Sequence, residues 1–189
     1  MVETDGTQAV PGDVTEGTVL TALGQWLCAT VPLPAASVMV GQVNRVAAPV
    51  GLFVIMTVAG RARVATNRTT YAQGCRIVWM QQQVDVRVDL HGPGAGDGAG
   101  RIALLFRDPA CAAFFAGMNT GAGGVTGGIA PLYATTAQQQ AFVSDAAQYE
   151  DAWHVTLSLQ VNSTATFPQD FANTLSVGIF ETDATFPPE

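Results

Sequence analysis

The sequence predicts an α+β fold in which a mainly antiparallel, or mixed, β-sheet is flanked by two or three helices. Residues 84–91 alternate apolar with charged or polar side chains, and residues 153–162 repeat this pattern. A period of two indicates strands with one buried face and one polar face. In residues 19–27 the apolar side chains recur at helical spacing instead. Because helix-like and strand-like segments come in groups, α+β is favoured over an alternating α/β arrangement.

The length and composition indicate one folded domain. The chain has 189 residues, 48% of them apolar, which is enough for a single buried core. No internal repeat or second-domain boundary is visible. We expect a flexible N-terminal arm at 1–12, a single α+β domain at 13–183 with a glycine-rich loop at 117–128, and a C-terminal tail at 184–189.

The first half of the chain is expected to hold one helix and three strands. Asp13 is positioned to cap the helix, and the two prolines within residues 31–34 end it. Strands are predicted at 38–43, 53–65 and 76–90, with a turn at 66–68. Because the second and third strands are long and joined by a short connection, we expect them to pair antiparallel.

The second half is expected to begin with a helix near Asp97, after a glycine-rich turn. Asp108 and Pro109 restart or kink this helix, since the pair suits a cap followed by a proline in the first turn. The remaining predictions are helix to residue 116, a strand at 153–161, a short helix at 168–174 and a last strand at 175–179.

Charge is unevenly distributed along the chain. The net charge is −7, lysine is absent, and all eight arginines lie between Arg45 and Arg107, whereas acidic residues gather towards both ends. The acidic balance argues against a protein that grips nucleic-acid phosphates. The separation of charge suits head-to-tail association of identical chains.

Membrane insertion and disulfide bonding are not expected. The longest apolar run, 49–60, is too short to span a bilayer, and the acidic N-terminal segment is unlike a secretion signal. The three cysteines are far apart and lack metal-ligand spacing, which indicates reduced thiols in a cytosolic product.

The glycine-rich turn at 92–100 contains a match to the dinucleotide-binding pattern, Gly94-x-Gly96-x-x-Ala99. Asp97 argues against that interpretation, because its charge would repel a pyrophosphate. The preceding strand is also half polar, unlike the doubly buried strand of such a site. We therefore expect no cofactor and interpret the turn as structural.

Asp85, Arg87 and Asp89 share the polar face of one strand. They are consistent with a metal or acid/base pair, but a cross-strand charge ladder on a solvated or subunit-contact face explains them more simply. His91 and His154 could meet if their strands pair, yet they lack metal-binding spacing. We predict no catalytic and no metal site. The predicted subunit-interface residues are Arg61, Arg63, Arg68, Asp85, Arg87, Asp89, Glu150 and Asp151.

Ordered blocks of sequence cover most of residues 50–188. They are ATNRTTY at 65–71, QVDVRVDLHGP at 83–93, the segment 99–108, PLY at 131–133, QYEDAW and the strand after it at 148–162, and FPP at 186–188. Together they resemble the neck or tail terminator proteins of tailed bacteriophages.

This resemblance implies a structural virion protein rather than an enzyme. Proteins of this kind form a ring, typically a hexamer, that caps the tail tube, ends its polymerisation and joins it to the head or neck. The implied fold is an antiparallel or mixed sheet flanked by helices. The implied partners are further copies of the chain, the tail tube protein and a head-completion, adaptor or neck protein. DNA would pass through the lumen without specific binding, and assembly would occur in the host cytoplasm.

Two alternatives remain open from the sequence. One is another junction protein, either a head-completion protein or a tail-tube subunit. The other is a small nucleotide-binding enzyme that uses the glycine-rich turn.

Overall fold

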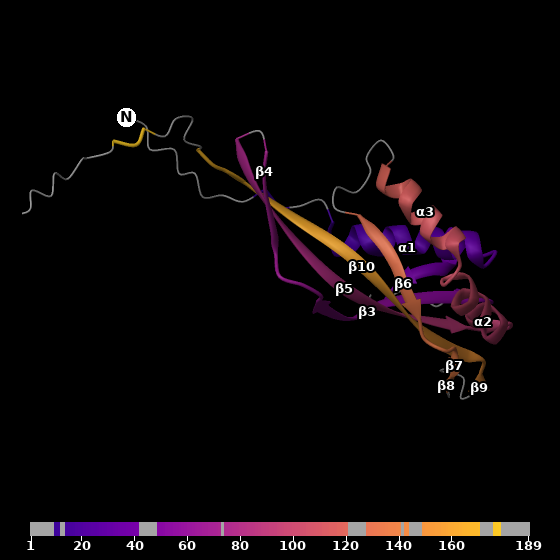
Figure 1. Cartoon of the computed structure of the whole chain (residues 1–189). Coiled ribbons are helices and arrows are strands. Elements are labelled where there is room, and N and C mark those ends of the chain that lie inside the picture. Colours follow the sequence, from indigo (N-terminus) through magenta and orange to yellow (C-terminus); the bar gives the residue numbers. More distant parts are fainter. Residues whose placement is uncertain are drawn as a thin grey trace, which may run out of the picture.

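The structure is a computed structural model, which describes residues 10–11, 14–41, 49–72, 74–120, 128–140, 142–143, 149–170 and 176–178. Two strands of 17 residues each, β5 (Cys75–His91) and β10 (Ala152–Pro168), dominate it (Figure 1). They pair antiparallel without a break, with Ala152 opposite His91 at one end and Pro168 opposite Cys75 at the other. Each strand contains the alternating segment that the sequence predicts, and each extends beyond its predicted bounds.

The other strands add to this central pair. β3 (Phe53–Arg63) lies antiparallel along β5, and β2 (Val38–Val40) lies parallel to β3, which makes the sheet mixed. Beyond β10 lie β6 (Ile129–Ala134) and β7 (Gln138–Gln139), while β4 (Arg68–Ala72) pairs with β5 and β1 (Val10–Pro11) with β10. A separate antiparallel pair consists of β8 (Phe142–Val143) and β9 (Tyr149–Glu150). The predicted antiparallel pairing of the strands at 53–65 and 76–90 is confirmed.

Three helices lie on one side of the sheet: α1 (Glu16–Thr30), α2 (Ala95–Leu105) and α3 (Pro109–Thr120) (Figure 1). A short 3-10 turn at Ala35–Ser37 connects α1 to β2. The α+β fold class is therefore confirmed. We call the sheet side under the helices the helix side, and the opposite side the open face.

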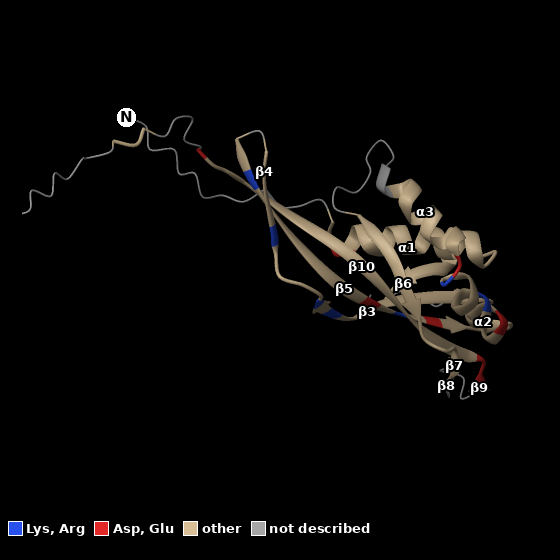
Figure 2. Cartoon of the chain, in the orientation of Figure 1, with Lys and Arg blue, Asp and Glu red and all other residues tan. Residues whose placement is uncertain are grey.

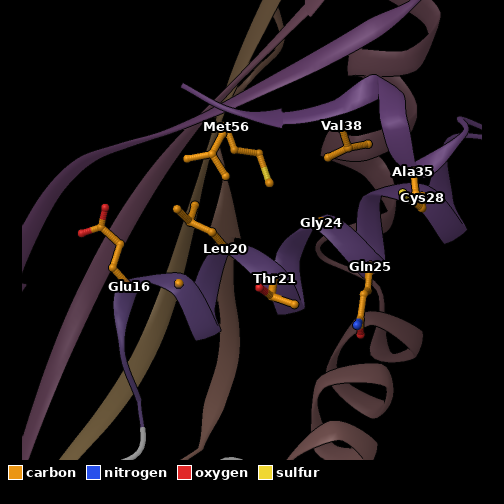
Figure 3. A pocket seen from close by; sticks show the side chains of 11 residues that line it. Glu16, Leu20, Thr21, Gly24, Gln25, Cys28, Ala35, Val38 and Met56 are labelled. Carbon is orange, nitrogen blue, oxygen red and sulfur yellow. The ribbon is translucent and has the colours of Figure 1, made fainter. Parts of the chain in front are cut away.

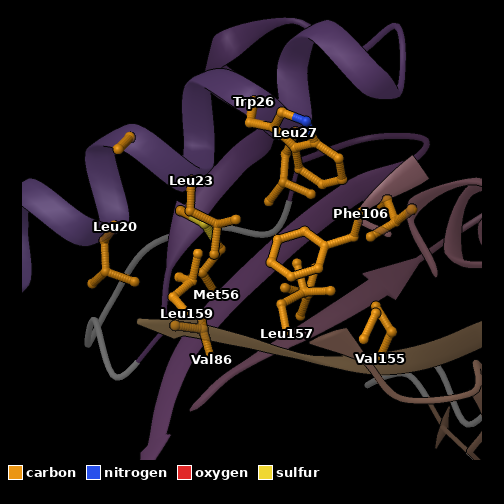
Figure 4. Close-up of a cluster of buried hydrophobic side chains, with 14 of the residues drawn as sticks. Leu20, Leu23, Trp26, Leu27, Met56, Val86, Phe106, Val155, Leu157 and Leu159 are labelled. Carbon is orange, nitrogen blue, oxygen red and sulfur yellow. The ribbon is translucent and has the colours of Figure 1, made fainter. Parts of the chain in front are cut away.

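The core lies between the helices and the helix side of β5 and β10 (Figure 4). Burying one such aliphatic or aromatic side chain contributes roughly 1.5–3 kcal/mol. Trp26 of α1 meets Phe106 edge to face, with ring centroids 5.3 Å apart, so α1 is joined to the segment between α2 and α3. Fully buried core residues include Leu23, Leu27, Val84, Val86, Val88, Leu90, Ile102, Phe115, Val155, Leu157 and Leu159.

One irregularity in β3 changes which side its distal residues face. Val58 lies opposite Val86, but the pairing then shifts, so that Gly60 lies opposite Asp85 and Arg61 opposite Val84. A β-bulge inserts one extra residue and reverses the alternation beyond it. Arg61 consequently lies on the helix side rather than on the open face.

The ends of β5 and β10 continue past the helices as a ribbon. Together with β4, residues 75–81 and 162–168 form what we call the β-arm (Figure 1). The described side chains of these two segments are half-buried rather than alternately buried, apart from the exposed Gln81 and Pro168. This pattern arises because none of the described helices packs on either face of the ribbon.

Several element boundaries in the first half of the chain differ from the sequence predictions. Thr15 rather than Asp13 caps α1, because its Oγ1 accepts from the Thr18 backbone N–H at 3.2 Å; Asp13 itself lies outside the described residues. The strand predicted at 38–43 ends at Val40, and residues 42–48 are outside the description. Arg68 begins strand β4 instead of closing a turn, and the long strand β3 ends at Arg63.

Further differences lie in the second half. α2 begins at Ala95, and α3 continues through Thr120, so residues 117–120 of the predicted glycine-rich loop are helical. Pro168 ends β10 rather than starting a helix, and residues 176–178 are not in a strand. The remaining predictions at 171–175 and 179–189, and the N-terminal arm before residue 10, lie outside the described residues.

Candidate assembly surface

The open face of the sheet presents polar side chains from both central strands. On β5, Asp85, Arg87 and Asp89 alternate with the buried valines, and the register places them beside Ser158, Thr156 and His154 of β10. The described helices α1, α2 and α3 all lie on the other side of the sheet (Figure 1), and on this face Asp85, Arg87 and Asp89 are half-buried. It carries three of the predicted interface residues together.

Asp85 joins three strands of the open face. Its Oδ1 accepts from Ser158 Oγ at 2.5 Å and from Gln83 Nε2 at 2.9 Å. The same Gln83 amide donates to the Tyr133 hydroxyl on β6 at 3.1 Å. A carboxylate held by two donors on a sheet serves to fix strand positions, and Ser158 is only 1% exposed. This arrangement is structural.

Arg87 and Asp89 form a second group. Arg87 Nε donates to both Asp89 oxygens, at 2.9 and 3.1 Å, and Arg87 Nη2 donates to Gln140 Oε1 at 2.5 Å. Gln140 closes the group by donating to Asp89 Oδ1 at 3.3 Å. Instead of the cross-strand charge ladder expected from the sequence, Arg87 and Asp89 form an ion pair along one strand, and Gln140, in the segment after β7, hydrogen-bonds to both.

The two histidines share the open face, but the register offsets them by two residues. His91 stacks on Phe53, with centroids 5.0 Å apart, and is 6% exposed. Burial lowers the pKa of His91 from its ordinary value, against the upward influence of Asp89 and Glu150. His91 therefore stays neutral at pH 7. The Nδ1 atom of His154 is buried and has no hydrogen-bond partner among the described residues.

No metal or catalytic centre emerges from these groups. Within the described part of the chain, His, Cys, Asp and Glu side chains do not gather in threes as a metal ion would require. Cys28, Cys75 and Cys111 are free thiols. Burial raises the pKa of the Cys111 thiol to about 12, so this group remains protonated and packs as a small apolar side chain.

Glu150 and Asp151 lie at the end of the sheet where β10 begins. The Trp153 indole donates to Asp151 Oδ1 at 2.8 Å, and the Gly92 backbone N–H donates to the Asp151 carbonyl at 2.9 Å. Both carboxylate side chains are exposed and border a hollow of about 490 Å³, whose other lining includes Phe53 and Pro93. We call this region the acidic end.

The predicted arginines lie elsewhere. Arg61 Nη2 pairs with Glu16 Oε2 of α1 at 2.6 Å, and Arg63 donates to the Ala65 carbonyl at 3.1 Å and to Asn67 Oδ1. Arg68 is exposed on the β-arm. The structure therefore divides the eight predicted interface residues among the open face, the acidic end, the distal part of β3 and the β-arm.

The structure brings three further β-arm residues together. Tyr71, Arg76 and Phe167 lie side by side across β4, β5 and β10. The sequence indicates them only weakly, because apolar and polar residues do not alternate regularly along the arm. The sequence also does not reveal where along the strands the covering helices end. A basic residue flanked by aromatics on adjacent strands is visible only when the register is known.

Comparison with protein families identifies the chain. The family described as phage neck terminator protein matches residues 17–183, which is nearly the whole α+β domain. The chain belongs to this phage neck terminator family. No curated protein matches it. Membership makes it a structural protein of the bacteriophage neck, hence a virion component that associates with other phage tail or head proteins.

In this neck terminator the glycine-rich turn has a packing role. A Cβ at Gly96 would lie 3.0 Å from the Trp153 ring, and one at Gly98 would lie 2.9 Å from a Leu90 methyl. The glycines therefore let α2 approach β5 and β10 closely. Asp97 occupies the first turn of α2, where its charge opposes phosphate binding.

A groove between α1 and β2 is the other notable feature of the neck terminator surface (Figure 3). Its volume is about 690 Å³, and Leu20, Val38 and Met56 line it with small residues of α1. Glu16 is the carboxylate at its edge, and that group is paired with Arg61. The groove lacks a convergent set of polar groups for chemistry. Among the described residues, no helix has the length and apolar character needed to cross a membrane.

Proposed function

We propose that this neck protein forms a closed homo-oligomeric ring, with six subunits expected, at the head–tail junction. The ring caps the tail tube, ends its polymerisation and joins it to the head or neck. The match of the neck terminator family over residues 17–183 carries the proposal. Its proposed partners are further copies of itself, the tail tube protein and a head-completion, adaptor or neck protein.

The surface chemistry of the subunit supports a ring. A ring requires a heterologous contact, in which two different surfaces of each subunit meet and the rotation closes. The subunit has such unlike surfaces, because exposed arginines lie on β3 and β4 whereas the exposed Glu150 and Asp151 lie at the acidic end (Figure 2). The contact candidates are Arg61, Arg63, Arg68, Asp85, Arg87, Asp89, Glu150 and Asp151.

The net charge of the chain supports passage of DNA through the lumen. At −7, a ring of such subunits has no general attraction for phosphates, so a DNA duplex can slide without being held. The proposed role is therefore structural, with assembly in the host cytoplasm and no enzymatic step.

Negative-stain electron microscopy and mass photometry of the purified protein test the ring. We expect closed rings of one size. A protein that stays monomeric at all concentrations would contradict the proposal, and open filaments would identify a tail-tube subunit instead, because a tube stacks repeatedly whereas a terminator caps once.

The capping function is tested separately in phage. A nonsense mutation in the gene should yield tails of irregular, excessive length that lack heads, and the supplied protein should restore tails of normal length. Tails of normal length without the protein would rule out termination of the tube.

A further inference from the structure

Neither face of the β-arm is covered by a helix in the part of the chain that the structure describes. Helices α1, α2 and α3 lie over the other part of the sheet, so β4 and the adjoining ends of β5 and β10 project beyond them (Figure 1). Tyr71 is 58% exposed there, and the large side chains of Trp79 and Phe167 are only half-buried. Large apolar side chains left on a projecting ribbon are typical of a surface that another chain covers.

Each face of the arm carries an arginine beside aromatic rings. On the helix side, Arg76 lies between Tyr71 and Phe167 in the register, with its guanidinium 4.8 Å from the centroid of the Phe167 ring. On the open side, Arg68 lies opposite Trp79. Residues 68–81 and 162–168 contain no carboxylate, and the next one along the chain is Asp170. The arm is thus basic and aromatic.

The acidic end lies at the opposite end of the same two strands (Figure 2). Fifteen residue steps of β5 separate Arg76 from His91, which corresponds to roughly 50 Å at the usual rise of a strand. The arm of a subunit therefore cannot reach its own Glu150 and Asp151. Opposite charges at the two ends of one ribbon favour a contact between different copies of the chain.

The acidic end also fits the arm in chemistry. Its hollow combines exposed Glu150 and Asp151 with apolar walls that include Phe53, Pro93 and Val50. Carboxylates bind guanidinium groups through paired hydrogen bonds, and apolar walls receive aromatic rings. We propose that the β-arm of one subunit docks on the acidic end of the next subunit in the ring. This inference rests on the proposed ring function.

Two charge-reversal variants test the contact. Variant A, R68E/R76E, makes the arm acidic. Variant B, E150R/D151N, makes the acidic end basic and keeps a side-chain oxygen at residue 151 for the Trp153 indole. Each variant alone should lose about tenfold or more of its rings in mass photometry, since like charges then meet at every contact.

Mixing the two variants gives the decisive result. In an equal mixture, the acidic arm of A meets the basic end of B, and the basic arm of B meets the acidic end of A. Rings with alternating subunits should therefore return, which requires an even number of subunits such as six. R101E, which reverses an exposed arginine on α2, should leave rings intact.

The outcomes separate this inference from the proposed function. If the unchanged protein forms no rings, both the proposed ring function and the proposed arm contact fail. If it forms rings and variants A and B do so equally well, or if the unchanged ring has an even number of subunits and folded A and B do not reassemble on mixing, the arm contact is overturned while the ring stands. Circular dichroism shows whether each variant folds, and R68E alone replaces variant A should the Arg76 change unfold the arm.

Discussion

Gly92 marks the point where the chain leaves β5 and comes closest to another backbone segment. Its φ is +97°, in the left-handed region, and a Cβ there would lie 2.4 Å from the Gly51 carbonyl oxygen. Gly94, at the cap of α2, has φ +82° but nothing within 4 Å of the same position. Both glycines thus have a positive φ, but the space beside their Cα atoms differs.

Alanine substitutions at these two glycines should distinguish the cost of backbone strain from the cost of a steric clash with the backbone of Gly51. Gly94→Ala should lower the free energy of unfolding by roughly 1–2 kcal/mol, the cost of the left-handed conformation. Gly92→Ala should cost roughly 1–3 kcal/mol more, because the methyl group must displace backbone. Urea denaturation followed by circular dichroism measures both, and equal losses would show that the approach to Gly51 is not tight.

His91 should make the stability of the subunit depend on pH. Burial lowers its pKa in the folded state below 6.5, so the unfolded chain binds the proton more readily. Its contribution is complete above pH 6.5 and is lost as the pH falls through that value towards the folded pKa. We expect His91→Phe, which keeps a ring against Phe53, to flatten the fall in stability between about pH 7.5 and 5.5, a window above carboxylate titration.

Thermal melting at both pH values checks this expectation. Both proteins retain His154, so the difference between them isolates His91. The same loss of stability in the two proteins would show that His91 does not titrate in this window.

At the level of elements, the N-cap of α1 is Thr15, two residues after the cap predicted from the sequence. Thr15→Ala removes the hydroxyl that accepts from the Thr18 N–H and should lower the free energy of unfolding by about 1 kcal/mol. Thr21→Ala is the matched control, because Thr21 is exposed within the same helix and alanine is a better helix former. If the two substitutions have the same effect on the urea midpoint, Thr15 is not the cap.

The bulge in β3 leads to an expectation for Arg61 and Arg63. Reversing both to Glu should disperse rings without unfolding the subunit. The fold should tolerate the change because Arg61 and Glu16 form an exposed ion pair, with side chains 41% and 55% exposed, and such pairs contribute at most about 1 kcal/mol. Mass photometry measures ring content and circular dichroism the fold; intact rings at ordinary salt would remove both residues from the interface.

Elements with a strong periodic signal were predictable from the sequence, and those without one were not. The alternation at 84–90 and 153–161 identified β5 and β10, since these segments of the two strands have one buried and one polar face. β4 was missed because most of its residues are exposed on both faces, which leaves no apolar period. β6 was missed because it contains Pro131 and forms only by pairing with β10, a partner distant in sequence.

For the whole molecule, salt should control assembly. If unlike charges hold the ring together, screening weakens the contact, since the Debye length falls from about 10 Å at 0.1 M to about 3 Å at 1 M salt. We expect the ring fraction in mass photometry to fall steadily over that range, with an unchanged circular dichroism spectrum. Rings that persist or grow at high salt would indicate a contact dominated by apolar burial.

The sequence by itself determined the α+β class, the two faces of the central strands, the acidic balance and the phage terminator resemblance. The fold class, the strand faces and the charge balance follow from local periodicity and composition, whereas the resemblance rests on ordered blocks of sequence that are similar to those of a known family. Only the tertiary structure decided that the bulge places Arg61 on the helix side and that Ser158 and Gln83 donate hydrogen bonds to Asp85. It also decided that β5 and β10 extend beyond the helices and form the β-arm. Burial and charge pairing depend on residues that are distant in the chain. The strand register must therefore be known before one can tell which polar side chains are exposed and which are hydrogen-bonded within the subunit.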